Sequence, residues 1–207
     1  MSNHTPRIDY SKKAEIIANT ELVHAIKQFK RECYKTGNLE TYYNLVKNDS
    51  DVKQIESIQL SYRKKALRIK TYLNSWLEKG SVIFGTLTFT DDVLNNTSSK
   101  TRKRYVERYL KNADVAYIAN IDYGAKNDRE HYHFIIATGN KNKLENWQYG
   151  FFNLKLVGNS ESDSTKVSKY VSKLTNHAIK NTNKRCVIIY SKNKTIDCDF
   201  EKIFKAL

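Results

Sequence analysis

The residues best placed to do chemistry are two histidines separated by one position, His131 and His133. They flank Tyr132 in the run HYHFIIAT, whose aromatic and β-branched residues are typical of a β-strand. Side chains alternate along a strand, so both imidazoles project from one face, roughly 6.5–7 Å apart at the backbone. Two imidazoles placed in this way can converge on one metal ion. The alternative is a pair of half-buried histidines with ordinary hydrogen bonds.

An acidic residue, Asp122, strengthens the case for a metal site. It lies near the end of the preceding predicted strand, and a hairpin through GAKNDRE sets it opposite the beginning of the histidine strand. If Asp122 faces the same side, two imidazoles and a carboxylate leave coordination positions open for water and a phosphate oxygen. A carboxylate at a strand end is also common without any metal.

A third element combines Tyr170 with Lys173 in KVSKYVSKLTNHA, where a spacing of three residues places both on one helix face. A phenol is a weak nucleophile at its free pKa of about 10. A metal that polarises the electrophile, together with a nearby lysine, can compensate for this. The alternative is a core tyrosine beside a solvated lysine, and the chain has 14 tyrosines.

The elements that must position these residues alternate between strands and helices after residue 80. Patterns of alternating apolar residues predict strands over 82–90, 114–123, 131–138, 151–157 and 185–191. Helical spacing predicts helices from residue 98 or 99 to about 111, over 141–148 and over 163–180. This order predicts an α+β, ferredoxin-like split βαβ fold with a five-stranded antiparallel sheet. Residues 1–79 are predicted to form a helical N-terminal region, and 80–207 the domain that carries the chemistry.

The composition indicates a polyanionic partner. The 207 residues carry a formal net charge of +14, and basic globular chains most often bind nucleic acid. A ribosome, an anionic membrane or simple solubilisation by lysine are the alternatives. Three cysteines without CxxC spacing form neither a disulfide framework nor a zinc knuckle. The N-terminus has no apolar segment of a signal peptide, and no apolar run spans a bilayer, so a cytoplasmic protein is expected.

Three short motifs occur in a fixed order: TLTF at 86–89, HYH at 131–133 and YVSK at 170–173. Together with the predicted strand order, they resemble the HUH endonuclease superfamily on its rolling-circle replication initiator (Rep) branch. The resemblance covers roughly residues 82 to 189. It implies an HUH nuclease domain that nicks single-stranded or hairpin origin DNA of a plasmid or virus. The products would be a 5′-phosphotyrosine link and a free 3′-OH, which starts rolling-circle replication.

The resemblance also implies roles for individual residues. His131 and His133 would bind a divalent metal, Mg²⁺ or Mn²⁺, and Asp122 would complete the site where many members have Glu. Glu130 is the alternative acidic ligand, although its adjacency to His131 points it to the other face. Tyr170 would be the nucleophile, and Lys173 would orient it or neutralise a phosphate oxygen.

Further residues are expected to contact the DNA. Thr86 and Thr88 would lie on or beside the DNA-binding face, and Arg129 matches a family arginine two residues before the first histidine. The candidates for holding the strand by charge are Arg102, Arg104, Lys166 and Lys169. Lys166 stands where some phage initiators have a second tyrosine, so a single-tyrosine enzyme is expected. Ending a round would then require a second protomer or water. A host polymerase and helicase are expected partners, because the chain has no nucleotide-binding loop.

Three other classes of protein remain open at this point. A single-strand transposase of the tyrosine HUH type would share the motifs. A non-catalytic basic nucleic-acid-binding protein would explain the charge alone. A metal-dependent hydrolase that acts through water would use the histidines but form no covalent adduct.

Overall fold

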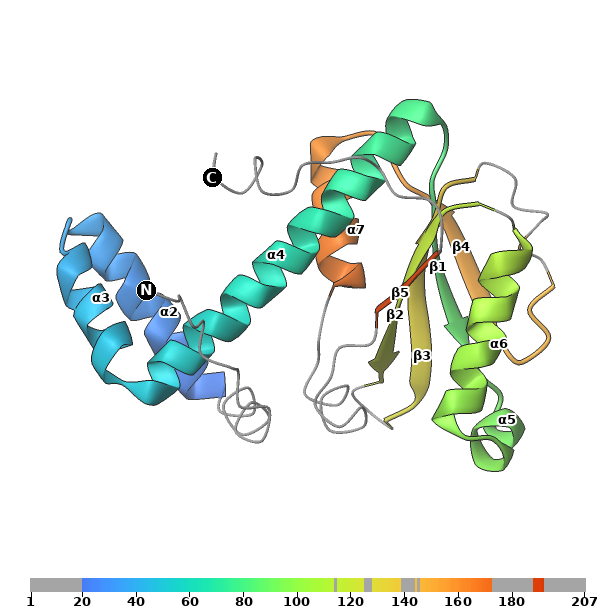
Figure 1. The fold of residues 1–207 in the computed structure, drawn as a ribbon, viewed down its shortest axis with the longest axis horizontal. Coiled ribbons are helices and arrows are strands. Elements are labelled where there is room, and N and C mark those ends of the chain that lie inside the picture. Colours follow the sequence, from blue (N-terminus) through green and yellow to red (C-terminus); the bar gives the residue numbers. More distant parts are fainter. Residues whose placement is uncertain are drawn as a thin grey trace, which may run out of the picture.

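A computed structural model describes residues 20–113, 115–124, 128–138, 144, 146–172 and 188–191. Its fold combines helices with an antiparallel sheet, as the sequence predicts (Figure 1). The strands lie in the order β4-β1-β3-β2-β5. Their bounds are Ile83–Thr88 for β1, Tyr117–Tyr123 for β2, Glu130–Ile136 for β3, Phe152–Leu156 for β4 and Ile188–Tyr190 for β5.

The central strand β3 pairs with β1 on one side and with β2 on the other. The β2–β3 turn is closed by a hydrogen bond from the Gly124 backbone N–H to the Arg129 carbonyl. This closure sets the register in which Asp122 faces His131 and Asn120 faces His133. The next pairing places Thr86 of β1 opposite His133. The register therefore gathers polar side chains at one end of three neighbouring strands.

One face of the sheet is covered by helix α6 (Ser99–Asn112), as Figure 1 shows. Alternate residues of β1 are fully buried there, including Ile83 and Leu87. Gly85 lies between them because a methyl group at this position would overlap the ring of Phe134 on β3. The short helix α5 (Asp91–Asn96) links β1 to α6. This apolar face holds the sheet against α6 and leaves the opposite face for the polar residues.

The opposite face is covered in part by helix α7 (Glu161–Val171) and by the end of helix α4 (Ser50–Lys79). Ile69, Leu73 and Trp76 of α4 share a core with Ile118 and Ile135 of the sheet. The long helix is thus part of the packing around the sheet, although the change from helix to strand in the sequence comes after it. The core of the sheet therefore extends across the predicted boundary at 79/80.

Helices α2 (Thr20–Lys35) and α3 (Leu39–Asn48) pack on the beginning of α4. Their shared core contains Ile26, Cys33, Tyr42 and Ile55. The helical N-terminal region is therefore present, with bounds close to those predicted from the apolar spacing. Figure 1 shows that α4 connects this helical group to the sheet.

Two details of the helices differ from the sequence prediction or lie outside the described residues. Helix α7 begins at Glu161, because the side chain of Ser160 accepts a hydrogen bond from the Asp163 N–H and caps it there. The predicted cap at Ser164 or Thr165 is therefore wrong. The predicted helix at 141–148 and the end of the helix predicted to residue 180 lie largely outside the described residues. Within the described part of the chain, no helix has the length and apolarity that crossing a membrane requires.

Candidate metal centre and neighbouring tyrosine

Asp122, His131 and His133 form a group that could hold a metal ion. The two Nε2 atoms of the histidines are 3.1 Å apart. Asp122 Oδ2 lies 3.8 Å from Nε2 of His131 and 3.9 Å from Nε2 of His133. Each residue thus presents one ligand atom to the same small space, on the side of the sheet away from α6.

The tautomer of His131 favours metal binding. Its Nδ1 lies 3.0 Å from the backbone carbonyl of Arg129. A carbonyl oxygen can only accept, so Nδ1 carries the proton and the lone pair of Nε2 faces the shared space. The same arrangement, in which a histidine ligand donates its other N–H to a carbonyl, orients imidazoles at metal sites generally.

His133 is held by a hydroxyl group. Its Nδ1 lies 3.0 Å from Oγ1 of Thr86, its partner on β1. A threonine hydroxyl both donates and accepts. Without a metal, His133 can donate from Nε2 to Nε2 of His131 and accept from Thr86. With a metal, the proton moves to Nδ1 and Thr86 becomes the acceptor. Thr86 therefore supports His133 in both tautomers, a role that the sequence analysis did not assign.

Asp122 is buried, with 6% of its surface exposed, and its carboxylate has a defined orientation. Oδ1 accepts a hydrogen bond of 2.8 Å from the backbone N–H of Tyr123. This bond leaves Oδ2 directed at the two imidazoles. The nearby carboxylate supplies the negative charge that a bound cation needs in a buried setting.

The three ligand atoms fit a divalent ion. Two ligands at right angles, each about 2.1 Å from an octahedral ion, lie about 3.0 Å apart. The observed separation of the two Nε2 atoms is 3.1 Å, so the imidazoles are already placed as neighbouring ligands. Two nitrogens and one carboxylate oxygen suit Mn²⁺ and other borderline divalent ions, and they leave positions for substrate oxygens.

Tyr170 lies directly beside this centre. Its ring is packed edge-on against the imidazole of His133, with the centroids 4.6 Å apart, and against Phe84 at 5.8 Å. Val171, the next residue of α7, is fully buried in the core under the helix. The core contact fixes the helix, while Tyr170 keeps 47% of its surface exposed. Lys173, the other predicted catalytic residue, lies outside the described residues.

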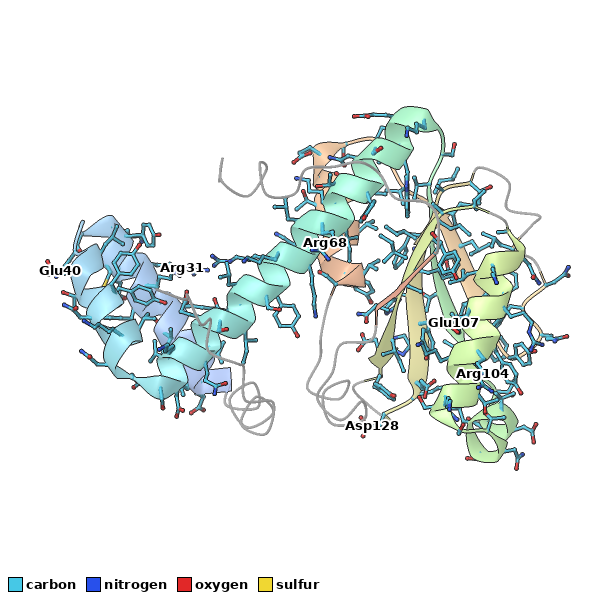
Figure 2. The ribbon with its side chains drawn as sticks, in the orientation of Figure 1. Arg31, Glu40, Arg68, Arg104, Glu107 and Asp128 are labelled. Carbon is cyan, nitrogen blue, oxygen red and sulfur yellow. The ribbon has the colours of Figure 1, made fainter. Side chains whose placement is uncertain are left out.

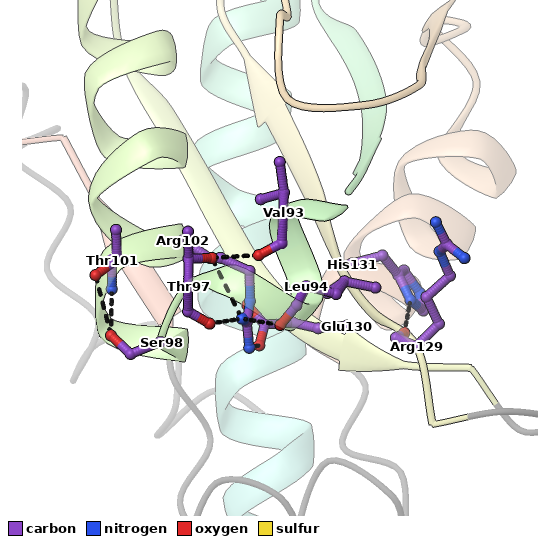
Figure 3. Close-up of polar contacts among 9 residues, drawn as sticks. All are labelled: Val93, Leu94, Thr97, Ser98, Thr101, Arg102, Arg129, Glu130 and His131. Carbon is purple, nitrogen blue, oxygen red and sulfur yellow. Dashed lines mark hydrogen bonds and ion pairs between the residues drawn. The ribbon is translucent and has the colours of Figure 1, made fainter. Parts of the chain in front are cut away.

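Glu130 is excluded from the metal group by its position. It is 3% exposed and lies on the α6 side of the sheet, where its Oε2 accepts from Arg102 Nη2 at 2.7 Å. Figure 3 shows Arg102 donating in addition to the carbonyls of Leu94 and Thr97. The hydrogen bond to Glu130 raises the pKa of the Arg102 guanidinium against the opposing effect of burial. Arg102, predicted to hold DNA, is thus committed to an internal ion pair.

Arg129 has a similar internal commitment. Its guanidinium pairs with Asp91 at 2.6 Å and donates to the carbonyl of Phe89, so it ties the β2–β3 hairpin to the start of α5. Its own carbonyl accepts from His131, as Figure 3 shows. The side chain therefore fixes the backbone that orients a metal ligand. The spacing of Arg129 relative to His131 marked the residue, but only the fold shows these partners.

The other predicted DNA contacts fall into two places. Thr88 lies on the same face as the histidines, opposite His131, and its hydroxyl donates to the carbonyl of Phe151. Lys166 and Lys169 are exposed on α7, close in sequence to Tyr170. Arg104 is exposed on α6, which covers the other face of the sheet (Figure 2). Lys166 and Lys169 thus adjoin the centre, whereas Arg104 does not.

Comparisons with known proteins agree with this placement. The family model of the replication-associated protein ORF2 matches residues 82–175. The match runs from the residue before β1 to just beyond α7 and includes the three candidate ligands and Tyr170. No curated protein and no solved structure matches the chain. The similarity to this family indicates a part in replication for the domain that holds the metal group.

Proposed function

We propose that this protein initiates replication by nicking single-stranded DNA, with Tyr170 as the nucleophile. The observation that carries the proposal is the contact between the rings of Tyr170 and His133, whose centroids are 4.6 Å apart. A half-exposed phenol beside a group of metal ligands can approach a phosphate that the same group binds. The similarity to the replication-associated family supports the biological role.

The reaction is a transesterification. The Tyr170 oxygen attacks phosphorus and loses its proton to solvent, and the bond from phosphorus to the 3′ oxygen breaks. That oxygen takes up a proton and leaves as a free 3′-OH, while the 5′ side stays joined to the tyrosine. One phosphate ester replaces another, so no water and no nucleotide cofactor are consumed. The free 3′-OH is the group that a host polymerase extends.

The residues around the phosphate have separate tasks. His131, His133 and Asp122 would hold a divalent ion, which would stabilise the negative charge that develops on the phosphate oxygens. Thr86 and the Arg129 carbonyl keep the imidazoles oriented. The buried side of α7 holds Tyr170 in place, so the phenol does not have to be ordered during the reaction.

The charge of the chain supports a nucleic acid substrate. A net charge of +14 attracts a polyanion, and Lys166 and Lys169 expose two of these charges on the helix of the nucleophile. A single-stranded or hairpin region is the form in which a phosphate is free to reach the centre. Since Lys166 replaces a second tyrosine on this helix, completing a cycle requires another protomer or water. A separate helicase would supply the melted strand.

A covalent adduct tests the proposal. The protein is incubated with Mn²⁺ and single-stranded DNA that carries a hairpin with a randomised loop, labelled at either the 5′ or the 3′ end. On a denaturing gel, the 3′ label should move with the protein, and the 5′ label should appear on a shortened strand that a polymerase extends. Tyr170→Phe should abolish the adduct, and EDTA should prevent it.

Tyr43→Phe is the matched control, because Tyr43 is also exposed but lies on α3, in the helical group. It should form as much adduct as the unchanged protein. Cleavage without any adduct would assign the activity to water and overturn the role of Tyr170. Binding without cleavage, unaffected by Mn²⁺, would instead indicate a non-catalytic nucleic-acid-binding protein.

A further inference from the structure

Strand β4 extends the row of side chains that contains the metal group. In the pairing of β1 with β4, Thr86 lies opposite Asn153 and Phe84 opposite Lys155. One step along, the Thr88 N–H donates to the carbonyl of Phe151, which continues the same ladder. Because residues directly opposite each other share a face, Phe151, Asn153 and Lys155 face the same side as His131 and His133. We call these three residues the β4 strip.

We propose that the β4 strip binds the single strand next to the scissile phosphate, with Phe151 as a stacking platform for one base. This inference rests on the proposed function for the substrate, but its residues are distinct from those of the reaction. All three side chains of the strip are accessible to solvent in part or in full, and Phe151 is exposed to 74%, the highest value among the large exposed hydrophobic residues described.

Phe151 is held at a fixed place relative to the metal group. Neighbouring strands lie about 4.8 Å apart, so its backbone is roughly 10 Å from that of His131, with Thr88 between them. Its carbonyl accepts from both the N–H and the hydroxyl of Thr88. A base stacked on this ring would therefore lie within a short reach of a phosphate at the histidines.

The segment before Phe151 is anchored in the core. Trp147 is 5% exposed, and its indole N–H donates to the carbonyl of Thr88 at 2.9 Å. Gly150 passes so close to β1 that a methyl group there would lie 2.8 Å from the Cα of Phe89 and would overlap the Thr88 carbonyl oxygen. The close approach requires glycine at this position. A rigid support of this kind lowers the entropic cost of using the phenyl ring as a platform.

The chemistry of the strip matches a single strand of nucleic acid. A phenyl ring offers its face to any base, an amide offers a donor and an acceptor, and an ammonium group attracts a phosphate. These occur in the order Phe151, Asn153, Lys155 along one line. A purely apolar protein partner would leave Asn153 and Lys155 desolvated and unpaired, whereas an unpaired strand contacts all three.

Phe152 provides a matched control within the same strand. It is also exposed, to 40%, but it lies opposite Leu87 and therefore faces the α6 side of the sheet. The experiment measures binding of a single-stranded oligonucleotide containing 2-aminopurine, without metal, by the quenching of its fluorescence. Phe151→Ala should weaken binding about five- to 150-fold, the range for losing one base–aromatic stack, and should reduce the quenching. Phe152→Ala should leave both unchanged, and Phe151→Trp should retain both.

The result also separates this inference from the proposed function. If Phe151→Ala and Phe152→Ala bind equally well, the β4 strip is not a binding site, even where the adduct of Tyr170 forms. If Phe151→Ala alone weakens binding while no variant forms an adduct, the strip holds and the nicking mechanism fails. Where both hold, Phe151→Ala should raise KM for the oligonucleotide and leave the rate at saturating DNA within about twofold. A thermal melt of each variant excludes loss of folding, because both phenyl rings are exposed.

Discussion

The ring of Tyr170 stands edge-on to the imidazole of His133, with their centroids 4.6 Å apart. The two residues are far apart in sequence and belong to different elements, α7 and β3. Their contact joins a potential nucleophile to a potential metal ligand without any residue between them. Substitutions in the residues that hold this arrangement should therefore change metal binding or stability in specific ways.

The metal group should depend on both histidines. His131→Ala and His133→Ala should each abolish tight Mn²⁺ binding, because one imidazole and one carboxylate cannot replace three converging ligands. Isothermal titration calorimetry measures the affinity. His24→Ala is the control, since His24 is exposed on α2, and it should bind Mn²⁺ normally. Unchanged Mn²⁺ binding by both histidine variants would refute the assignment of this group.

Thr86 should tune the same site without being a ligand. Thr86→Val keeps the shape of the side chain but removes the hydroxyl that contacts Nδ1 of His133. Metal affinity should fall about 10- to 100-fold, the usual cost of losing such a partner. Thr86→Ser should restore most of it. Thr88→Val is the matched control, because the Thr88 hydroxyl bonds to a backbone carbonyl instead; equal losses in both valine variants would contradict the prediction.

The internal ion pair of Arg102 should contribute strongly to stability. Arg102→Met leaves the Glu130 carboxylate buried without its cation, which should lower the free energy of unfolding by roughly 3–5 kcal/mol. Arg104→Met, two positions along the same helix, should change it by less than about 0.5 kcal/mol because Arg104 is exposed. Urea denaturation measures both. Equal stability of the two variants would mean that the ion pair contributes little.

The buried tyrosines should make the protein sensitive to alkali. Burial, reinforced by Glu130, raises the pKa of Tyr123 to about 12, from 10.0. The unfolded chain therefore loses this proton first, so the contribution of Tyr123 to stability is complete below pH 10 and is lost as the pH rises toward 12. Each such tyrosine adds a slope of up to about 1.4 kcal/mol per pH unit in this window.

Urea denaturation at several pH values between about 8 and 12 measures this slope. Tyr123→Phe should fall less steeply with pH than the unchanged protein, with the comparison at the lowest pH giving the effect of the substitution on packing alone. Parallel curves for the two proteins would show that Tyr123 titrates alike in both states.

Much of the candidate site follows from local rules. The alternation of side chains in HYH places His131 and His133 on one face wherever the strand lies, and the same rule turns Glu130 away from them. The strands and the helical region are predicted with small errors at their ends. Those errors arise because caps such as Ser160 depend on one local hydrogen bond.

Other features depended on pairing between distant segments. The sequence shows that Arg102 and Arg129 are basic, but their partners Glu130 and Asp91 become neighbours only when α5 and α6 pack against β3. The sequence determined which residue types can bind a metal, attack a phosphate and carry the charge. The tertiary structure decided which of them meet, because strand register places Thr86 on His133 and Phe151 beside Thr88, and helix packing sets Tyr170 against His133.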